Sequence, residues 1–231
     1  MIPNKNLFIV TSSVKPVVGV YSHPVRYQQT IDSLISLRNT IKDDIIMFVD
    51  VSVVPLTDEE RKNISEKCDI FMDASNIPIV RELSLKGFKG HAETALLYNI
   101  MMNLKYDLQM QKIMQPVKRI FKFSGRTLMT EDFNIKDYDG LFGKFVFKKR
   151  IPTWMSEVKH GATDLLITRM FSFCPSLIDT YAEVSKKNFE LLNDIDFEHA
   201  HFVNIPKEHL VEFDTIGCIG YLAGNGNIER Y

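Results

Sequence analysis

The chain has 231 residues, 45% hydrophobic and 25% charged, which is long enough to bury a substantial core as one α/β domain. Its net charge of −1 and pI near 6.6 give no general electrostatic reason to expect nucleic acid or an anionic membrane as partner. No apolar run is long enough to predict a membrane span, and the polar N-terminus argues against a secretory signal. The three cysteines are far apart and form no CxxC motif, so we expect reduced thiols and a cytoplasmic protein, in the host cytoplasm if it is viral.

The first half of the chain alternates strand and helix. The expected elements are a strand at Leu7–Val10, a helix from about Pro24 to Ile41, a strand at Ile45–Val49, a short helix that begins at the capping box of Thr57 and Glu60 and ends near Lys67, a strand at Ile70–Met72, a helix at His91–Leu104 and a strand around Ile120–Phe123. Such alternation predicts right-handed crossovers and a mostly parallel central sheet flanked by helices.

The second half has a different character. Its expected elements are strands at Leu141–Lys148 and Leu165–Phe173, a long amphipathic helix at Pro175–Leu192, a short helix at Glu198–Val203 and a strand at Thr215–Leu222. There is no internal repeat, low-complexity segment or linker rich in Gly, Ser or Pro, so we expect a single domain over residues 1–231.

The most informative motif is Ser124-Gly125-Arg126, which follows the strand around Ile120–Phe123. Ligands of open α/β sheets bind beyond the carboxyl ends of the strands. An arginine there suits a phosphate or a sugar hydroxyl, and Gly125 would let the backbone come close. The alternative is a plain turn with a surface arginine. Lys122 lies four residues before Arg126 and would join it if the strand ran through both positions.

Three further segments bring polar groups to the same edge of the sheet. Thr11 and Ser12 follow the first strand, Arg26 lies on a polar side of the first helix, and Asp50 ends the second strand, where it could accept a hydrogen bond from a base or ribose. The segment Lys86–Glu93 runs from a glycine-containing loop into a helix, so that Lys89 and Gly90 could cradle an anion. Each segment also fits an ordinary turn or a solvent-facing stripe, and no P-loop or GxGxxG motif is present.

Together these segments resemble a family. The residues that carry the resemblance are Arg26–Thr30 with Ser36–Arg38, Lys89–Glu93, Phe121–Arg126 and Asn204–Lys207. They are similar to landmarks of small GT-A-like glycosyltransferases, which are encoded in polysaccharide-synthesis clusters and in large phage or viral genomes. The resemblance implies a Rossmann-like nucleotide-diphospho-sugar transferase fold, with residues 1–135 binding a UDP- or GDP-sugar donor and residues 136–231 facing a glycan acceptor.

The sequence departs from this family at the metal site. Most GT-A enzymes place Asp-x-Asp after the fourth strand, where it holds Mn²⁺ or Mg²⁺, whereas this chain has Ser124-Gly125-Arg126. Either Arg126 and nearby lysines neutralise the diphosphate without a metal, or Asp137 and Asp139 reach back from the next loop as ligands. A third alternative is that the catalytic site has decayed.

An inverting transferase also needs a base for the acceptor hydroxyl. We expect Glu198 in this role, supported by His199 or His201, because neighbouring phenylalanines would bury its carboxylate and raise its pKa. Asp194 and Asp196 are the reserve candidates. His91 and Glu93 are two lesser candidates, which could instead orient the donor or simply open a helix. The single tryptophan, Trp154, is either an acceptor-side stacking platform or a core or loop anchor.

Three functions fit these features. The first is transfer of a sugar from a nucleotide-activated donor to an acceptor hydroxyl. The alternatives are a catalytically inactive nucleotide- or sugar-binding protein of the same fold, and a nucleotidyltransferase. Transfer of a sugar to DNA is disfavoured, because tight duplex binding generally needs a basic face.

Overall fold

A seven-stranded mixed sheet forms the centre of the computed structural model, which describes residues 4–221 and 227–231. The strand order is β10-β6-β9-β4-β1-β2-β3. Four strands are mutually parallel: β1 (Lys5–Ser12), β2 (Ile45–Asp50), β3 (Ile70–Asp73) and β4 (Val117–Ser124). Beyond them, β9 (Met170–Phe173) pairs antiparallel to β4 and to β6 (Phe145–Lys148), and β10 (Leu210–Phe213) pairs parallel to β6 at the edge. The predicted mostly parallel sheet is thus confirmed.

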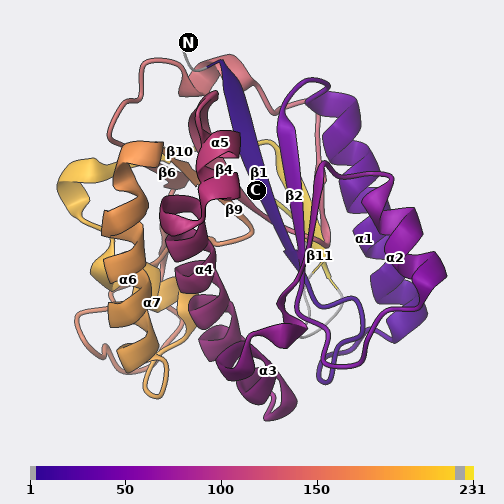
Figure 1. Ribbon diagram of the computed structural model, residues 1–231. Coiled ribbons are helices and arrows are strands. Elements are labelled where there is room, and N and C mark those ends of the chain that lie inside the picture. The colour runs from indigo at the N-terminus through magenta and orange to yellow at the C-terminus, as the bar shows by residue number, and fades with distance from the viewer. Residues whose placement is uncertain (1–3, 222–226) are drawn as a thin grey trace.

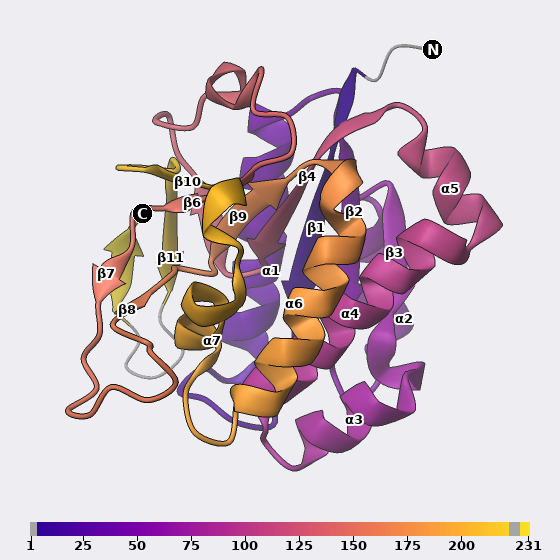
Figure 2. The ribbon, with the colours of Figure 1, turned by 90° about the vertical axis from the view of Figure 1, so that its left-hand side faces the viewer.

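Helices cover both faces of this sheet (Figure 1). One face carries α1 (His23–Thr40) and α2 (Asp58–Ser65). The other carries α3 (Pro78–Leu85), α4 (Lys89–Tyr106), α5 (Leu108–Met114), α6 (Ile178–Leu191) and α7 (Phe197–Asn204). Figure 2 shows α4 and α6 side by side on this second face, with α7 beyond α6.

Alternation along β1 divides the core between these two faces. Leu7 and Ile9 pack with α4 and α6, whereas Phe8 and Val10 pack with α1. Successive strand residues point to opposite faces, so a central strand covered on both sides is apolar throughout. The apolar run of Leu7–Val10 therefore predicted a strand that is buried on both faces, and the structure confirms it.

The helix starts also follow local chemistry. The Thr57 hydroxyl accepts from the Glu60 amide at 3.2 Å, and a Glu60 carboxylate oxygen accepts from the Thr57 amide at 2.7 Å. This confirms the capping box that opens α2. Pro24 stands in the first turn of α1, where its missing amide hydrogen costs nothing.

The order of the parallel strands creates a switch point. After β1 the chain moves outward through β2 to β3, and then returns to the other side of β1 with β4. The crossovers on the two sides of β1 therefore diverge, which leaves a crevice beyond the carboxyl ends of β1 and β4. No described helix is both long enough and apolar enough to cross a membrane.

Two small sheets lie outside the central one. A three-stranded sheet combines β5 (Thr127–Met129), β11 (Cys218–Tyr221) and β12 (Ile228–Arg230). A hairpin of β7 (Ile151–Pro152) and β8 (Asp164–Leu165) contacts α7 at the edge of the molecule. Four short 3₁₀ turns complete the described elements, at Ala74–Asn76, Ile135–Tyr138, Pro175–Leu177 and Lys207–His209.

The prediction of one strand over Leu165–Phe173 is wrong. Residues 164–165 belong to β8 and residues 170–173 to β9, and the chain between them is a loop. Leu166 and Ile167 are nevertheless buried, which explains the strand-like pattern. The strand expected at Leu141–Lys148 begins only at Phe145, and that expected at Thr215–Leu222 begins at Cys218, while Leu222 lies outside the described residues.

Candidate active site

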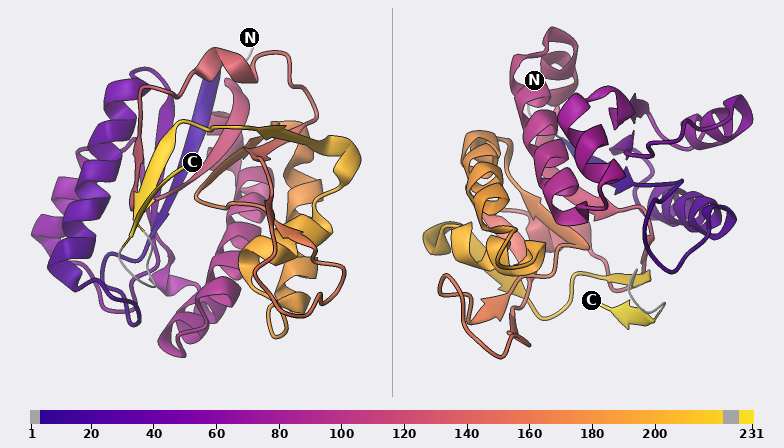
Figure 3. Two further views of the ribbon diagram at one scale, coloured as in Figure 1. Left: turned by 180° about the vertical axis from the view of Figure 1, so that it is seen from behind. Right: turned by 90° about the horizontal axis from the view of Figure 1, so that it is seen from below.

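A pocket of about 170 Å³ opens at the switch point, beyond the carboxyl ends of β1 and β4. Figure 3 looks onto this edge of the sheet in its right-hand view. The strand ends, the loop after β1 and the first turns of α4 line it: Thr11, Ser12, Ser13, Pro16, Val17, Val18, Gly19, Tyr21, Arg26, Val51, Ser84, Lys89, Ala92, Glu93, Leu96, Ser124 and Arg126. Of the predicted donor-binding residues, the pocket thus gathers Thr11, Ser12, Arg26, Lys89, Ser124 and Arg126.

Gly125 joins the ends of β1 and β4, between the pocket-lining residues Ser124 and Arg126. Its amide donates to the Thr11 carbonyl at 2.9 Å, and a Cβ at this position would lie 2.6 Å from the Ser12 Cβ. No real Cβ approaches so closely, so any larger residue would force the strand ends apart. The missing side chain of Gly125 therefore lets the end of β1 pack closely against the end of β4. The sequence instead predicts that it would let the backbone approach a ligand.

Arg26 is buried in the wall, and each nitrogen of its guanidinium is hydrogen-bonded to the protein. Its guanidinium donates to Ser12 Oγ at 3.0 Å, to Gln29 Oε1 at 3.0 Å and to the Ser13 carbonyl at 3.3 Å. Burial and the nearby Arg169 lower the pKa of Arg26 to about 10. Because its donors hold the loop after β1, Arg26 shapes the pocket and adds positive charge to it.

Arg126 and Lys89 differ from Arg26 in having no partner for their charged groups. Within residues 4–221 and 227–231, neither side chain makes a hydrogen bond or an ion pair. Burial and the charges of Arg169 and Arg26 lower the pKa of Arg126 to about 9. Burial and Arg126 likewise lower the pKa of Lys89. These two cations thus line the pocket without a hydrogen-bonded partner in the described chain, so their donors are free to meet an anion.

Lys122 and Glu93 form an ion pair next to the pocket wall. Lys122 Nζ lies 2.5 Å from Glu93 Oε1 and donates to the Thr168 carbonyl at 3.0 Å, and Thr11 Oγ1 donates to Glu93 Oε1 at 3.4 Å. Burial would raise the pKa of Glu93, but Lys122 and nearby arginines outweigh it and hold that pKa below its usual value. Lys122 is buried and does not line the pocket, so its predicted contact with the ligand is not borne out.

The loop between β8 and β9 brings a residue that the sequence analysis misses. Arg169 acts electrostatically on Glu198, Glu93, Arg126 and Arg26, and its carbonyl accepts from the Ser124 amide at 2.9 Å. Its position was hidden inside the wrongly predicted strand. A turn signal was lacking there, because the loop contains neither glycine nor proline.

Glu198 lies on α7, beside the pocket rather than in its lining. One carboxylate oxygen accepts from Thr168 Oγ1 at 2.9 Å. Burial raises the pKa of Glu198, although Arg169 and the Thr168 hydroxyl oppose the shift. The carboxylate also acts on the charge of Arg126. The prediction of a partly buried carboxyl group with a raised pKa is therefore confirmed, while its catalytic role stays a prediction.

The two histidines of α7 are structural. His199 is buried, with Nδ1 2.7 Å from Asp196 Oδ1 and Nε2 2.7 Å from Thr153 Oγ1. Because a carboxylate only accepts, Nδ1 donates to Asp196, and in the neutral ring Nε2 then accepts from Thr153. His201 is buried against Tyr181 and the Phe197 carbonyl, and burial lowers its pKa to about 4. Neither ring reaches the pocket, which corrects the predicted support for Glu198.

Trp154 lies in the loop that His199 holds in place. The residue is 67% exposed, and the centroid of its ring lies 4.8 Å from that of His199 at an interplanar angle of 76°. The Met155 amide donates to Thr153 Oγ1 at 3.1 Å, which fixes the loop further. The tryptophan is therefore not part of the core. It is an exposed aromatic surface on a well-anchored loop.

Asp50 and Gly90, like Lys122 and Gly125, were predicted to bind the donor but lie outside the pocket lining. Asp50 Oδ1 accepts from Ser52 Oγ at 2.7 Å, from the Ser52 amide at 3.2 Å and from the Val14 amide at 3.3 Å. Burial raises the pKa of Asp50 to about 6. It thus joins the loops after β1 and β2. Gly90 faces Leu192 and Phe197, where a Cβ would meet the end of α6 instead of a ligand.

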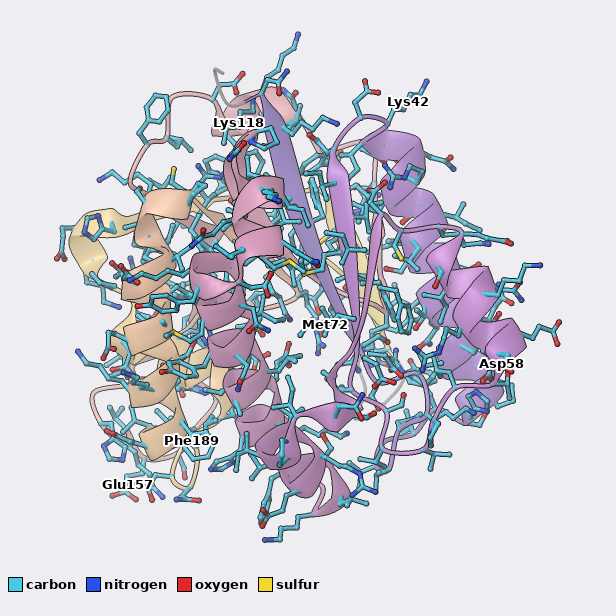
Figure 4. All side chains as sticks on the ribbon, in the orientation of Figure 1. Lys42, Asp58, Met72, Lys118, Glu157 and Phe189 are labelled. Carbon is cyan, nitrogen blue, oxygen red and sulfur yellow. The ribbon has the colours of Figure 1, made fainter. Side chains whose placement is uncertain are left out.

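The proposed metal ligands Asp137 and Asp139 lie at the wrong end of the sheet. Asp139 Oδ1 is 2.9 Å from Lys118 Nζ, and Asp137 accepts from Asn134 at 2.7 Å. Figure 4 labels Lys118 near the amino end of the sheet. At about 3.3 Å per residue, β4 separates Lys118 from Ser124 by about 20 Å, so the two carboxylates do not reach the pocket.

His91, Asp194 and Asp196 also have local roles. The His91 ring stands perpendicular to that of Phe189 with centroids 5.1 Å apart. Asp194 pairs with His160 at 2.8 Å, and Asp196 caps α7 by accepting from the His199 amide at 3.0 Å. Three of the lesser candidates are therefore occupied within the fold, and Glu93 alone lines the pocket.

Solved structures of glycosyltransferases share this architecture. Core-mannan synthase A (CmsA/Ktr4) from Aspergillus fumigatus, in a Mn/GDP form, aligns over 91% of this chain and 73% of its own, with a TM-score of 0.50 and 9% identity. The mannosyltransferase Ktr4p of S. cerevisiae aligns over 91% and 69%, with a TM-score of 0.52 and 9% identity. No family model matches the sequence, and no curated protein matches it either. The chain thus has the GT-A glycosyltransferase fold that the sequence motifs predicted, and at this identity the likeness shows the fold alone.

Proposed function

We propose that this protein is a glycosyltransferase that binds a nucleotide-activated sugar in the switch-point pocket and transfers the sugar to an acceptor hydroxyl. The observation that carries the proposal is the pair of unpartnered cations, Arg126 and Lys89, which line a pocket at the ligand-binding edge of a GT-A fold. One of the two structural neighbours is a core-mannan synthase in a Mn/GDP form, and the other is a mannosyltransferase. They support a nucleoside diphosphate sugar, either of uridine or of guanosine, as the donor.

In this proposal the diphosphate lies against Arg126 and Lys89, and the loop after β1 covers the nucleoside. The loop supplies apolar walls from Val17, Val18 and Tyr21, which suit a flat base and a ribose. As the sugar leaves, negative charge grows on the diphosphate. A guanidinium that is already in place stabilises that charge without reorganisation.

Glu198 is the proposed base on the acceptor side. Its raised pKa brings the carboxylate closer to the working pH, where a proton acceptor is most effective. Thr168 holds one oxygen at 2.9 Å, which fixes the orientation of the carboxyl group. Trp154 is exposed and its ring contacts His199 on α7, the helix that carries Glu198, so it supplies an aromatic surface on which an acceptor sugar can stack.

A panel of UDP- and GDP-sugars tests the proposal, with the released nucleoside diphosphate as the readout. We expect release with at least one donor, and loss of most of it in Arg126→Ala. Lys186→Ala, which removes an exposed charge on α6, is the matched control and should react like the unmodified protein.

The other two functions would give different results. A thermal shift with a nucleotide sugar but no release of nucleoside diphosphate, with any acceptor tried, would favour the inactive binding protein. Pyrophosphate released from a nucleoside triphosphate would indicate a nucleotidyltransferase. Either result would contradict the proposed function.

A further inference from the structure

The pocket combines a large positive charge with few carboxylates. Five cationic side chains lie at or beside it: Arg26, Lys89, Lys122, Arg126 and Arg169. The carboxylates that act on them are Glu93, Glu198 and Asp50. Positive charge is therefore in excess when all these groups are ionised.

Each of these carboxylates is already held by the protein. Glu93 Oε1 is 2.5 Å from Lys122 Nζ, and Glu198 Oε1 accepts from Thr168. Asp50 Oδ1 accepts three hydrogen bonds from the loops after β1 and β2. In the part of the chain that the structure describes, no group of three or more His, Cys, Asp or Glu side chains is placed to hold a metal ion.

Positively charged side chains thus surround the place where the GT-A fold usually binds a divalent cation. Ser124 ends β4 and Arg126 follows it, where the fold's usual pattern has carboxylates, and the charges of Arg169 and Arg26 act on Arg126. A divalent cation there would be repelled by each guanidinium, and the carboxylate in the pocket lining, that of Glu93, is already paired with Lys122. The residues present do not fit a metal.

The same residues fit a dianion. Arg126 offers a planar fork of donors that matches two phosphate oxygens, and Lys89 adds a point charge at the start of α4. An incoming diphosphate would relieve the mutual repulsion of the arginines, because it supplies the negative charge that the pocket lacks.

We propose that Arg126 and Lys89 replace the divalent metal of the GT-A fold, so that the protein binds the diphosphate of its nucleotide without any metal ion. This inference rests on the proposed function, since it concerns the donor of the same reaction. It assigns to two side chains the charge neutralisation that a metal would otherwise perform.

Calorimetric titration of the full chain with UDP and with GDP tests this inference, first in EDTA and then with excess Mn²⁺. For the nucleotide that binds, we expect dissociation constants within about threefold of each other in the two conditions. Arg126→Ala should weaken binding in EDTA by about 10–100-fold, the loss expected for a charge-assisted phosphate contact. Lys186→Ala should bind as the unmodified protein does.

Lys89→Ala provides a second variant in case Arg126→Ala does not fold. Lys89 is exposed at the start of α4, so its removal should leave the fold intact. Its binding in EDTA should weaken by about 3–10-fold.

Three results would overturn the metal replacement. Binding that weakens tenfold or more in EDTA would show that a metal is needed, while leaving the glycosyltransferase proposal intact. Unchanged binding in EDTA for both folded variants would show that the two cations are not the phosphate site. If neither nucleotide bound in either condition, the proposed function would fail, and this inference with it.

Discussion

Two arginines stand near opposite ends of β4, and their surroundings differ. Arg119, near the amino end, is 3% exposed and donates to Ser172 Oγ at 2.8 Å, to the Leu141 carbonyl at 3.0 Å and to the Lys144 carbonyl at 3.1 Å. Arg126, beyond the carboxyl end, has no hydrogen bond to its guanidinium in the described chain. The guanidinium of Arg119 is thus hydrogen-bonded within the fold, while that of Arg126 remains available to a ligand.

The comparison shows that burial of a charge does not by itself indicate a functional site. A buried cation whose donors are all engaged contributes to the fold, and replacing it leaves carbonyl oxygens unsatisfied. A cation held at a pocket without partners costs free energy in the unliganded protein. That cost is recovered when an anion binds, so the unpartnered arginine is the better indicator of function.

The largest effect is expected from Glu198→Gln. This variant tests whether the pocket at the carboxyl ends of the strands catalyses sugar transfer as well as binding the nucleotide. The variant keeps the shape and can still accept from Thr168, but it cannot take a proton. Transfer should fall by about 10²–10⁴-fold while nucleotide binding survives. Release assays and calorimetry on the same preparation separate the two effects, and Glu183→Gln on α6 is the control. Unchanged transfer would move the base to another carboxylate.

Arg119→Ala tests the structural end of the comparison. Removing the guanidinium leaves the Leu141 and Lys144 carbonyls and the Ser172 hydroxyl without this donor. The free energy of unfolding should fall by about 3 kcal/mol, measured by denaturant titration. The fraction that remains folded should bind nucleotide as the unmodified protein does. Weaker binding in the folded fraction would show that the two ends of β4 are coupled.

Asp50→Asn extends the comparison to a carboxylate. Asp50 ends β2 at the edge of the sheet that forms the pocket, yet its Oδ1 accepts hydrogen bonds from the protein, as a structural residue would. The folded state raises its pKa from 3.8 to about 6, so the folded protein binds more protons than the unfolded chain between these values. The unmodified protein should therefore lose stability as pH rises from about 4 to about 6, by about 2 kcal/mol relative to the variant.

The variant Asp50→Asn keeps an oxygen that can accept from Val14 and Ser52. Nucleotide binding at neutral pH should therefore persist, as calorimetry can check. A loss of binding would restore the predicted contact of Asp50 with the base or ribose.

The smallest effect is expected from Arg126→Met on the unliganded protein. Methionine keeps much of the apolar stem but removes a charge that lies among Arg169 and Arg26. The free energy of unfolding should stay level or rise by about 1 kcal/mol, in contrast to the loss in Arg119→Ala. The gain in melting temperature on adding the nucleotide should disappear. A marked loss of stability without ligand would mean that Arg126 is structural after all.

The sequence by itself determined the parallel part of the sheet. Apolar runs such as Leu7–Val10 and Ile46–Val49 are buried on both faces, so each of these strands is apolar at successive positions. The capping box of Thr57 and Glu60 is equally local, because both partners lie within one helical turn. Since ligands bind where such strands end, the sequence also indicated Thr11, Ser12 and Arg126 as pocket residues.

Only the tertiary structure decided which polar residues remain available. Arg119 and Arg126 look alike in the sequence, and the difference lies in partners that are 22 to 53 residues away from Arg119 along the chain. Arg169 was concealed because Leu166 and Ile167 are buried in a loop, where an apolar pattern resembles a strand. Local sequence encodes burial and turn geometry, whereas the balance of donors, acceptors and charges in a pocket depends on residues that meet only after folding.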